Sequence, residues 1–233
     1  SAITAQCMSN QRQLAAAWTM HADDHDAEPM PHRAPGATDR VYWYGREDPR
    51  SGRIDHDAAP IAPYLDAALG PRSVFECPAQ PEGTYTPQGQ IDAFTTTYGY
   101  NAYALAPSST GYHALANRRP TRIHQIDRPS HQLVFADTLL KLFGDLPMSS
   151  ALLDPPVLYQ GSGRWVENFS PTTAFRHNID RGRGFGVAVN ARADASVHTT
   201  GHDPDARMIP EHAIGSISAA NDPHYIQRPE QWR

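Results

Sequence analysis

Two histidines near the start of the chain are the first residues whose spacing fits metal chemistry. His21 and His25, in the segment "HADDH", stand four positions apart, so on a helix both imidazoles share one face, as in zinc metalloproteases. The residue after the first histidine is Ala22, where those enzymes carry the glutamate that acts as general base. The pair therefore predicts a solvated helix end rather than a catalytic zinc site.

Alternating acidic residues overlap this segment. Asp24, Asp26 and Glu28 resemble the opening of a calcium-binding loop, in which oxygen ligands come from alternate positions. Pro29 stands where such a loop needs its turn glycine, and Pro35 stands where it needs a bidentate glutamate. These prolines exclude a regular loop of that kind and leave a less regular calcium site open.

Other patterns do not nominate a catalytic centre. The glycines of "GRGFG" at 182–186 precede an expected strand, whereas phosphate-binding loops follow a strand and open a helix. No G-x-S-x-G elbow marks a nucleophile. Carboxylate pairs for sugar cleavage could be drawn from Asp137, Asp145 and Asp194, but the sequence gives no basis for pairing them.

Composition and charge narrow the class of protein. A length of 233 residues with 21 prolines and 16 glycines favours one domain with many turns and long connections. The formal charge of -5 and a single lysine, Lys141, argue against a nucleic-acid surface, which needs clustered cations. No apolar run is long enough to span a membrane, and no signal peptide is visible. The two cysteines, Cys7 and Cys77, fit either two buried thiols or one disulfide.

The pattern of apolar residues predicts one long helix followed by short strands. Residues 2–23 contain neither proline nor glycine and carry apolar residues at helical spacing. Apart from Ser1 there is no capping signal, so we expect this helix to continue upstream. Strands are expected at 41–45, 95–103 and 131–138, an extended stretch at 73–78, a hairpin at 184–200, a short helix at 61–69 and a loosely held polar tail at 221–233. These elements predict an α+β fold in which a helix packs on an antiparallel sheet with long loops.

Five motifs, taken in order, resemble those of pseudopilin-like proteins that carry a prepilin-type N-terminal cleavage and methylation segment. They are "CMSNQRQLAAAWTMHADDHDAEPMP" at 7–31, "VFECPAQP" at 74–81, "YGYN" at 98–101, "RPSHQLVFADT" at 128–138, and "FRHN" at 175–178 followed by "ARADASVH" at 191–198. The last motif departs from the family pattern of a His, nine residues and Asp-Gly. Sixteen residues separate His177 from Asp194, and Ala195 replaces the glycine, although alanine resists the positive φ of such turns. Segments 31–73 and 139–173 carry no motif.

The resemblance implies a pilin-like fold and a non-enzymatic role. Residues 1–26 would be the lower part of a spine helix whose upstream part anchors the protein in the inner membrane, 27–220 the globular head, and 221–233 a polar tail. The head would lie outside the cytoplasm as a subunit or accessory of a type II secretion or type IV pilus-like assembly. Its partners would be other pseudopilin-like subunits or secreted cargo. In that compartment a disulfide between Cys7 and Cys77 would close a long loop and stabilise the fold by about 4 kcal/mol.

The resemblance leaves ligands open. A structural calcium ion is conceivable, as in pseudopilin heads of secretion systems, with Asp137 and Asp194 as candidate ligands. One alternative function is an extracellular carbohydrate-binding or substrate-binding module, since Trp43 and Trp165 lie in loop-rich segments and aromatic rings stack on sugars. A second alternative is a metal-dependent hydrolase, because twelve histidines are numerous for this length.

Overall fold

The N-terminal helix, α1, spans Ala2–Asp24 and confirms the helix predicted from the sequence. It belongs to a computed structural model that describes residues 1–31, 40–66, 72–85, 96–107, 118–141, 147–160 and 163–232. The side chain of Ser1 caps the helix by accepting a hydrogen bond from the backbone N–H of Thr4 (3.3 Å). Within these ranges, no helix combines the length and the apolar character that crossing a membrane requires.

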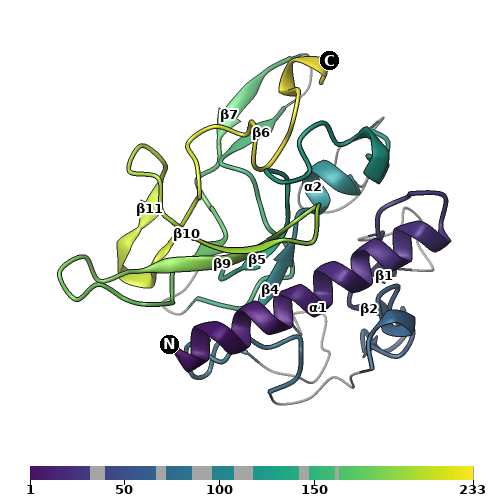
Figure 1. Ribbon diagram of the computed structural model, residues 1–233, viewed down its shortest axis with the longest axis horizontal. Coiled ribbons are helices and arrows are strands. Elements are labelled where there is room, and N and C mark those ends of the chain that lie inside the picture. The colour runs from purple at the N-terminus through teal and green to yellow at the C-terminus, as the bar shows by residue number, and fades with distance from the viewer. Residues whose placement is uncertain are drawn as a thin grey trace.

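One face of α1 packs on the main sheet (Figure 1). Cys7, Leu14 and Trp18 are fully buried, and their spacing places them on one stripe of the helix. The indole N–H of Trp18 donates to the Tyr100 hydroxyl (3.3 Å), and the Gln11 amide donates to the backbone carbonyl of Val189 (2.9 Å). Because these contacts reach two strands, they fix both the position and the rotation of α1.

The main sheet has four antiparallel strands in the order β10-β9-β5-β4. Their bounds are Tyr98–Tyr100 for β4, Leu133–Asp137 for β5, Val187–Arg192 for β9 and Val197–Gly201 for β10. All five residues of β5 are buried, so this strand is covered on both faces. The fold class is therefore α+β with an N-terminal helix and antiparallel sheets, as predicted.

The C-terminal segment covers the face of the sheet opposite α1. Tyr225, Ile226 and Trp232 are buried and belong to one apolar cluster with Leu133 and Ala136 of the sheet. In Figure 1 the chain end lies beside β6 and β7, far from α1. The prediction of a loosely held tail at 221–233 is wrong, because three large apolar side chains spaced along this polar segment complete a second core.

Smaller elements surround these layers. They are β1 (Arg40–Tyr42), β2 (Gly45–Glu47), β3 (Ile54–Asp55), β6 (Val157–Tyr159), β7 (Trp165–Glu167), β8 (Thr173–Ala174), β11 (Met208–Ile209), β12 (Ile214–Gly215), the short helix α2 (Ala102–Leu105) and 3-10 turns at Ala62–Tyr64, Ile123–Gln125, Pro210–His212 and Pro229–Gln231. They form a β1-β2-β3 sheet, a β11-β12-β8 sheet and a β6-β7 hairpin.

Three local predictions need correction. The single strand expected at 41–45 is divided by a turn: Val41 and Tyr42 belong to β1, Gly45 belongs to β2, and residues 43–44 form the hairpin turn between them. The Trp43 ring is buried in this turn, and its indole N–H donates to the Ala151 carbonyl (3.0 Å). The extended stretch expected at 73–78 forms no strand and contains turns on both sides of Glu76 and Cys77. The helix expected at 61–69 is one 3-10 turn, Ala62–Tyr64, and the end of that prediction, from residue 67, lies outside the described residues.

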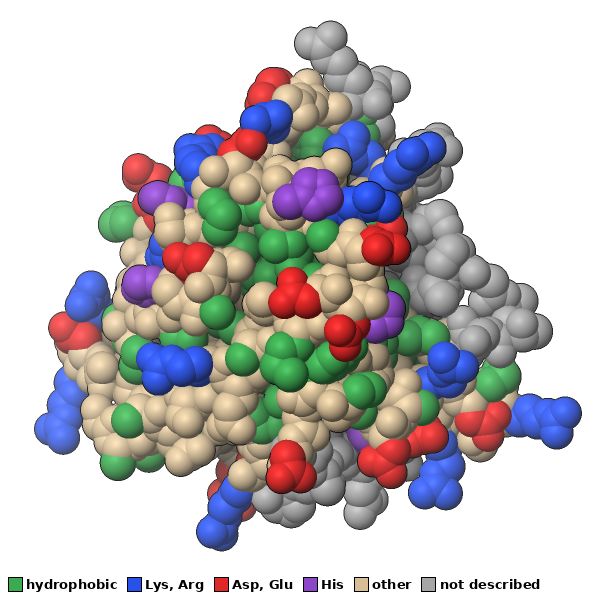
Figure 2. All heavy atoms as spheres, turned by 45° about the vertical axis from the view of Figure 1, so that its right-hand side comes forward, with side chains coloured by type: hydrophobic (Ala, Val, Ile, Leu, Met, Phe, Trp, Pro, Cys, Tyr) green, Lys and Arg blue, Asp and Glu red, His purple; other side chains and the backbone are tan. Residues whose placement is uncertain are grey.

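Charged side chains of both signs are interspersed on the face shown in Figure 2. Exposed ion pairs include Arg183 with Asp180 and Arg207 with Glu167, each at 3.4 Å. Solvated pairs of this kind contribute at most about 1 kcal/mol each. The fold therefore depends on its buried contacts.

The turn between β9 and β10 places Ala195 at φ +61°. The Ala195 N–H donates to the Arg192 carbonyl, the Arg192 N–H donates to the Ser196 carbonyl, and the Asp194 carboxylate accepts from the Ser196 N–H. Alanine resists a positive φ, and Ala195 nevertheless adopts one in this turn. The hydrogen bonds within the turn offset the backbone strain at Ala195.

We expect Ala195→Gly to stabilise the protein by about 1 kcal/mol, because glycine adopts the left-handed region without the steric cost that alanine carries. Urea unfolding measures the change. Ala16→Gly, on the exposed side of α1, is the matched control and should destabilise by about 1 kcal/mol. A loss of stability in both variants would contradict the strain assigned to Ala195.

Candidate metal-binding site

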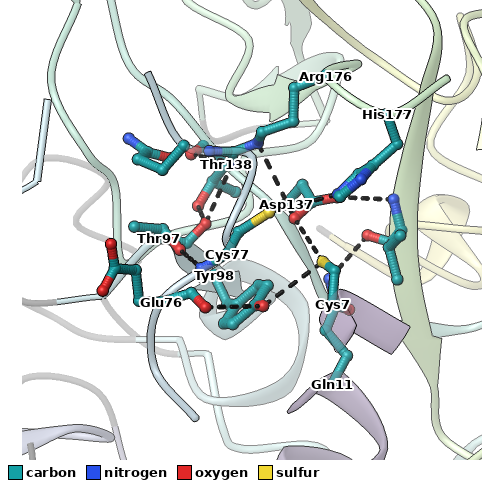
Figure 3. Close-up of polar contacts among 12 residues, drawn as sticks. Cys7, Gln11, Glu76, Cys77, Thr97, Tyr98, Asp137, Thr138, Arg176 and His177 are labelled. Carbon is teal, nitrogen blue, oxygen red and sulfur yellow. Dashed lines mark hydrogen bonds and ion pairs between the residues drawn. The ribbon is translucent and has the colours of Figure 1, made fainter. Parts of the chain in front are cut away.

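Four buried side chains with metal-ligating atoms converge between α1 and the main sheet (Figure 3). They are Cys7, Cys77, Asp137 and His177, and their ligand atoms all lie within 4.8 Å of one another. None of the four residues is more than 2% exposed. Two sulfur atoms, one carboxylate and one imidazole thus share a site that solvent does not reach.

Each of the four residues comes from a different part of the chain. Cys7 lies on the buried face of α1, and Asp137 is the last residue of β5. Cys77 follows a turn and its backbone N–H donates to the Thr97 hydroxyl (2.6 Å). His177 follows β8 and pairs with Val187 through two backbone hydrogen bonds of 3.0 and 2.8 Å. The site therefore depends on the packing of the helix, the sheet and two loops.

The Asp137 carboxylate is the centre of the group. It accepts hydrogen bonds from the Val189 N–H (2.7 Å) and the Cys7 thiol (3.2 Å), and its Oδ2 lies 3.1 Å from Nε2 of His177. The guanidinium of Arg176 lies 3.9 Å away and donates to the Thr138 carbonyl (2.7 Å). Burial alone would raise the pKa of Asp137, but His177, Arg176 and Val189 hold that pKa below its usual value. The carboxylate is therefore ionised.

One nitrogen of His177 faces both a carboxylate and a sulfur. Its Nε2 lies 3.1 Å from Asp137 and 3.3 Å from Sγ of Cys77, while its Nδ1 has no hydrogen-bond partner among the described residues. Burial would lower the pKa of His177, but Asp137 and Cys77 raise it to about 9.

The two thiols differ in their electrostatic surroundings. Burial raises the pKa of Cys7, and the nearby sulfur and carboxylate raise it further. Burial would also raise the pKa of Cys77, but hydrogen bonds from Cys7 and His177 together with the charge of Arg176 lower it to about 7. Of the two sulfurs, Cys77 is thus the one that more readily becomes a thiolate.

This geometry differs from a cysteine-protease triad. In a triad the histidine uses one nitrogen for the nucleophile and the other for the carboxylate. Here Cys77 and Asp137 share Nε2 of His177, and the sulfur is fully buried. The ligand atoms of the four residues lie close to one another and are enclosed by protein, so the group could hold a metal ion.

The predicted disulfide partners lie together, but the bond is not formed. Cys7 and Cys77 are both free thiols in the structure. They share the site with Asp137, one of the two aspartates predicted as metal ligands. The other, Asp194, is exposed in the β9-β10 turn and accepts hydrogen bonds from Ser196. A calcium site formed by both aspartates is thus not what the structure assembles.

The histidine pair and the acidic run at the end of α1 do not converge. The rings of His21 and His25 stack at 4.0 Å, so they face each other rather than a shared ion. Asp24 accepts from the Tyr64 hydroxyl (2.9 Å), and Glu28 pairs with Arg122 (3.7 Å).

The predicted aromatic binding residues separate. Trp43 is fully buried and cannot present its ring to a surface ligand. Trp165 is half-buried and lies against Tyr159 and Trp232, with ring centroids 5.2 and 5.4 Å away. Asp145 lies outside the described residues.

Sequence reasoning named every residue of the site but did not join them. Cys7 and Cys77 were paired with each other, Asp137 was a calcium candidate, and His177 was part of a motif. Arg176 and Tyr98, whose hydroxyl donates to the Cys7 sulfur (3.4 Å), were missed. One feature of the sequence could have indicated the site. Four of the five motifs each contain one of the four ligating residues.

We expect Asp137→Asn to destabilise the protein by about 3 to 5 kcal/mol, because it leaves Arg176 and His177 buried without their carboxylate. Chemical denaturation measures the loss. Asp194→Asn, in the exposed turn, is the control and should stay within about 0.5 kcal/mol of wild type, because an amide oxygen can still accept from Ser196. Equal losses in the two variants would contradict the central place of Asp137.

We expect His21 to make stability fall at acidic pH. Burial, with a smaller contribution from the stacked His25, lowers the pKa of His21 from 6.5 to about 4. The unfolded chain then binds more protons than the folded one between these values, so stability is complete above pH 6.5 and falls as the pH drops toward 4. The slope from one group is at most about 1.4 kcal/mol per pH unit.

The measurement compares the free energy of unfolding of wild type and His21→Gln across this range. The glutamine variant should lose less stability on acidification. Identical pH profiles would show that His21 does not contribute.

Comparison with family models, with curated proteins and with solved structures finds no match for this chain.

Proposed function

We propose that this protein is a non-enzymatic, pseudopilin-like subunit of a type II secretion or type IV pilus-like assembly outside the cytoplasm. The observation that carries the proposal is the division of α1 into two faces. One face is buried on the antiparallel sheet, and the other is exposed and carries one charged residue, Arg12, between Ala2 and Met20. A helix of this kind can belong to a head domain and still pack against other helices.

The outer face of α1 is defined as its exposed residues up to Met20, namely Ala2, Ile3, Ala5, Gln6, Ser9, Arg12, Gln13, Ala16 and Met20. Asp23 and Asp24, at the end of the helix, are also exposed and are charged. Arg12 is the only Lys, Arg, Asp or Glu residue between Ala2 and Ala22. Ile3 and Met20 are about half exposed, at 49% and 50%.

Small and uncharged side chains suit packing between helices. Helix axes approach to about 8 to 10 Å, and the closer distances need small residues at the contact. Alanine and serine residues alternate with larger ones along the outer face. A solvated helix normally carries charged residues on its outer side. The scarcity of charge therefore favours a partner on this face.

The burial of the four-residue site is consistent with the non-enzymatic role in this proposal. Cys77 and His177, whose pKa values are shifted, are enclosed between α1 and the sheet, where no substrate has access. Of the two tryptophans predicted for a carbohydrate-binding module, Trp43 is fully buried and only Trp165 is partly exposed. The hydrolase alternative has no exposed nucleophile next to a base at this site.

Photo-crosslinking in the cells that make the protein tests the proposal. We expect benzoylphenylalanine at Ala16, on the outer face, to form covalent adducts with this protein or with other pilin-like subunits, identified by mass spectrometry. The same amino acid at Ser51, exposed in the loop between β2 and β3, is the control and should give few such adducts. Equal labelling at both positions, or no adduct with a pilin-like subunit from Ala16, would contradict the proposal.

The coding sequence upstream of Ser1 gives an independent check. The proposal expects a short basic leader, a prepilin-type cleavage site and about 20 apolar residues there. A hydrophilic domain at that place would overturn it.

A further inference from the structure

The geometry points to a structural zinc site formed by Cys7, Cys77, Asp137 and His177. The site goes beyond the proposed assembly role, because it concerns how α1 is attached to the head and not what α1 contacts. Four ligand atoms lie within 4.8 Å of one another and are buried together (Figure 3).

The distances between ligand atoms approach those of a zinc tetrahedron. With zinc bonds of about 2.3 Å to sulfur and about 2.0 to 2.2 Å to nitrogen and oxygen, the edges of the tetrahedron measure about 3.3 to 3.8 Å. The observed separations are 3.2 Å from Cys7 Sγ to Asp137 Oδ1, 3.3 Å from Cys77 Sγ to His177 Nε2, and 3.1 Å from His177 Nε2 to Asp137 Oδ2. The two distances to Asp137 end on different oxygens, one of which would bind zinc in a four-coordinate site. The longest pair, at no more than 4.8 Å, needs to close by about 1 Å.

The chemistry of the donor atoms selects the metal. Two thiolates, one imidazole and one carboxylate form the mixed, tetrahedral set that zinc accepts, whereas calcium and magnesium need sets dominated by oxygen. All four positions are filled by protein and none is left for water or substrate. A closed set of this kind marks a structural zinc and not a catalytic one.

The charges of the zinc-bound site balance. Two thiolates and the Asp137 carboxylate carry three negative charges, and the ion together with the nearby Arg176 guanidinium carries three positive charges. Zinc binding releases to solvent the protons that the ligand atoms hold. A buried site without net charge avoids the cost of an uncompensated ion.

Residues around the ligands are placed to support the bound form. The Tyr98 hydroxyl donates toward Cys7 Sγ (3.4 Å), and the Val189 N–H donates to Asp137 (2.7 Å). Such donors orient ligands and lower the charge density on thiolate and carboxylate. Removing the donor by Tyr98→Phe should lower zinc affinity about 10- to 100-fold.

The site and the disulfide predicted from the sequence exclude each other, because both use the same two sulfur atoms. Zinc binding needs two reduced cysteines, while the disulfide needs an oxidant that removes two electrons and both thiol protons. Zinc additionally recruits Asp137 and His177, so it would join four segments of the chain instead of two.

The test begins with the metal content of the whole chain, purified under reducing conditions without chelator and supplied with zinc. We expect one zinc ion per chain, a rise in thermal midpoint over the chelator-treated protein, and loss of bound zinc in Cys77→Ser and His177→Ala. His21→Ala, which removes a buried histidine outside the site, is the matched control and should keep its zinc. Zinc loss in His21→Ala to the same extent would contradict the assignment.

A second measurement on wild type does not depend on whether the variants fold. X-ray absorption should show zinc with two sulfur neighbours at about 2.3 Å and two lighter neighbours. Cobalt substitution should give the strong visible bands of a tetrahedral ion and a thiolate charge-transfer band. A zinc shell without sulfur, no bound zinc with both thiols free, or a Cys7–Cys77 disulfide in the purified protein would each overturn the inference.

Discussion

The buried carboxylate of Asp137 is the interaction on which the arrangement of helix and sheet depends. An ionised carboxylate without solvent costs several kcal/mol unless donors and positive charge surround it. Those partners come from α1 through Cys7, from β9 through Val189 and from the segment after β8 through Arg176 and His177. A shift of any of these elements would leave a buried charge or a buried donor unpaired. The polar site therefore fixes elements that apolar packing alone would place less specifically.

The apolar layers on both faces of the sheet exclude water from the buried polar site and so strengthen its electrostatic interactions. The core between α1 and the sheet contains Trp18 and Trp43, and the core on the opposite face contains Tyr225 and Trp232. Because both faces of β5 are covered, Asp137 at its end is shielded from water and its interactions are weakly screened. A firmly attached α1 also suits the proposed role, since a helix that packs in an assembly must transmit its position to the head.

Local sequence patterns were sufficient for elements whose residues are neighbours in sequence. The absence of proline and glycine in 2–23 predicted α1, and the alternation around Val187 and Val189 predicted the β9-β10 hairpin. The tail at 221–233 was mispredicted because its few apolar residues have no periodicity and are buried only by strands distant in sequence. The stretch at 41–45 was predicted as one strand, but the buried Trp43 lies in the turn that divides it between β1 and β2.

The composition of the site could not be predicted from local sequence patterns either. Cys7, Cys77, Asp137 and His177 are separated by long stretches of chain, and only the folded sheet brings them within 4.8 Å. The resemblance to a family pointed to the proximity of Cys7 and Cys77, but it predicted a disulfide and not the carboxylate and imidazole beside them. No pattern of spacing reveals that a carboxylate at the end of a strand will face a helix cysteine.

A crystal structure of the zinc-loaded protein, with diffraction measured on both sides of the zinc absorption edge, tests the central claim most directly. The account predicts one anomalous peak at the centre of the four ligand atoms, with α1 held on the sheet by Cys7. Continuous density between the two sulfur atoms, or an ordered site without an anomalous peak, would contradict it.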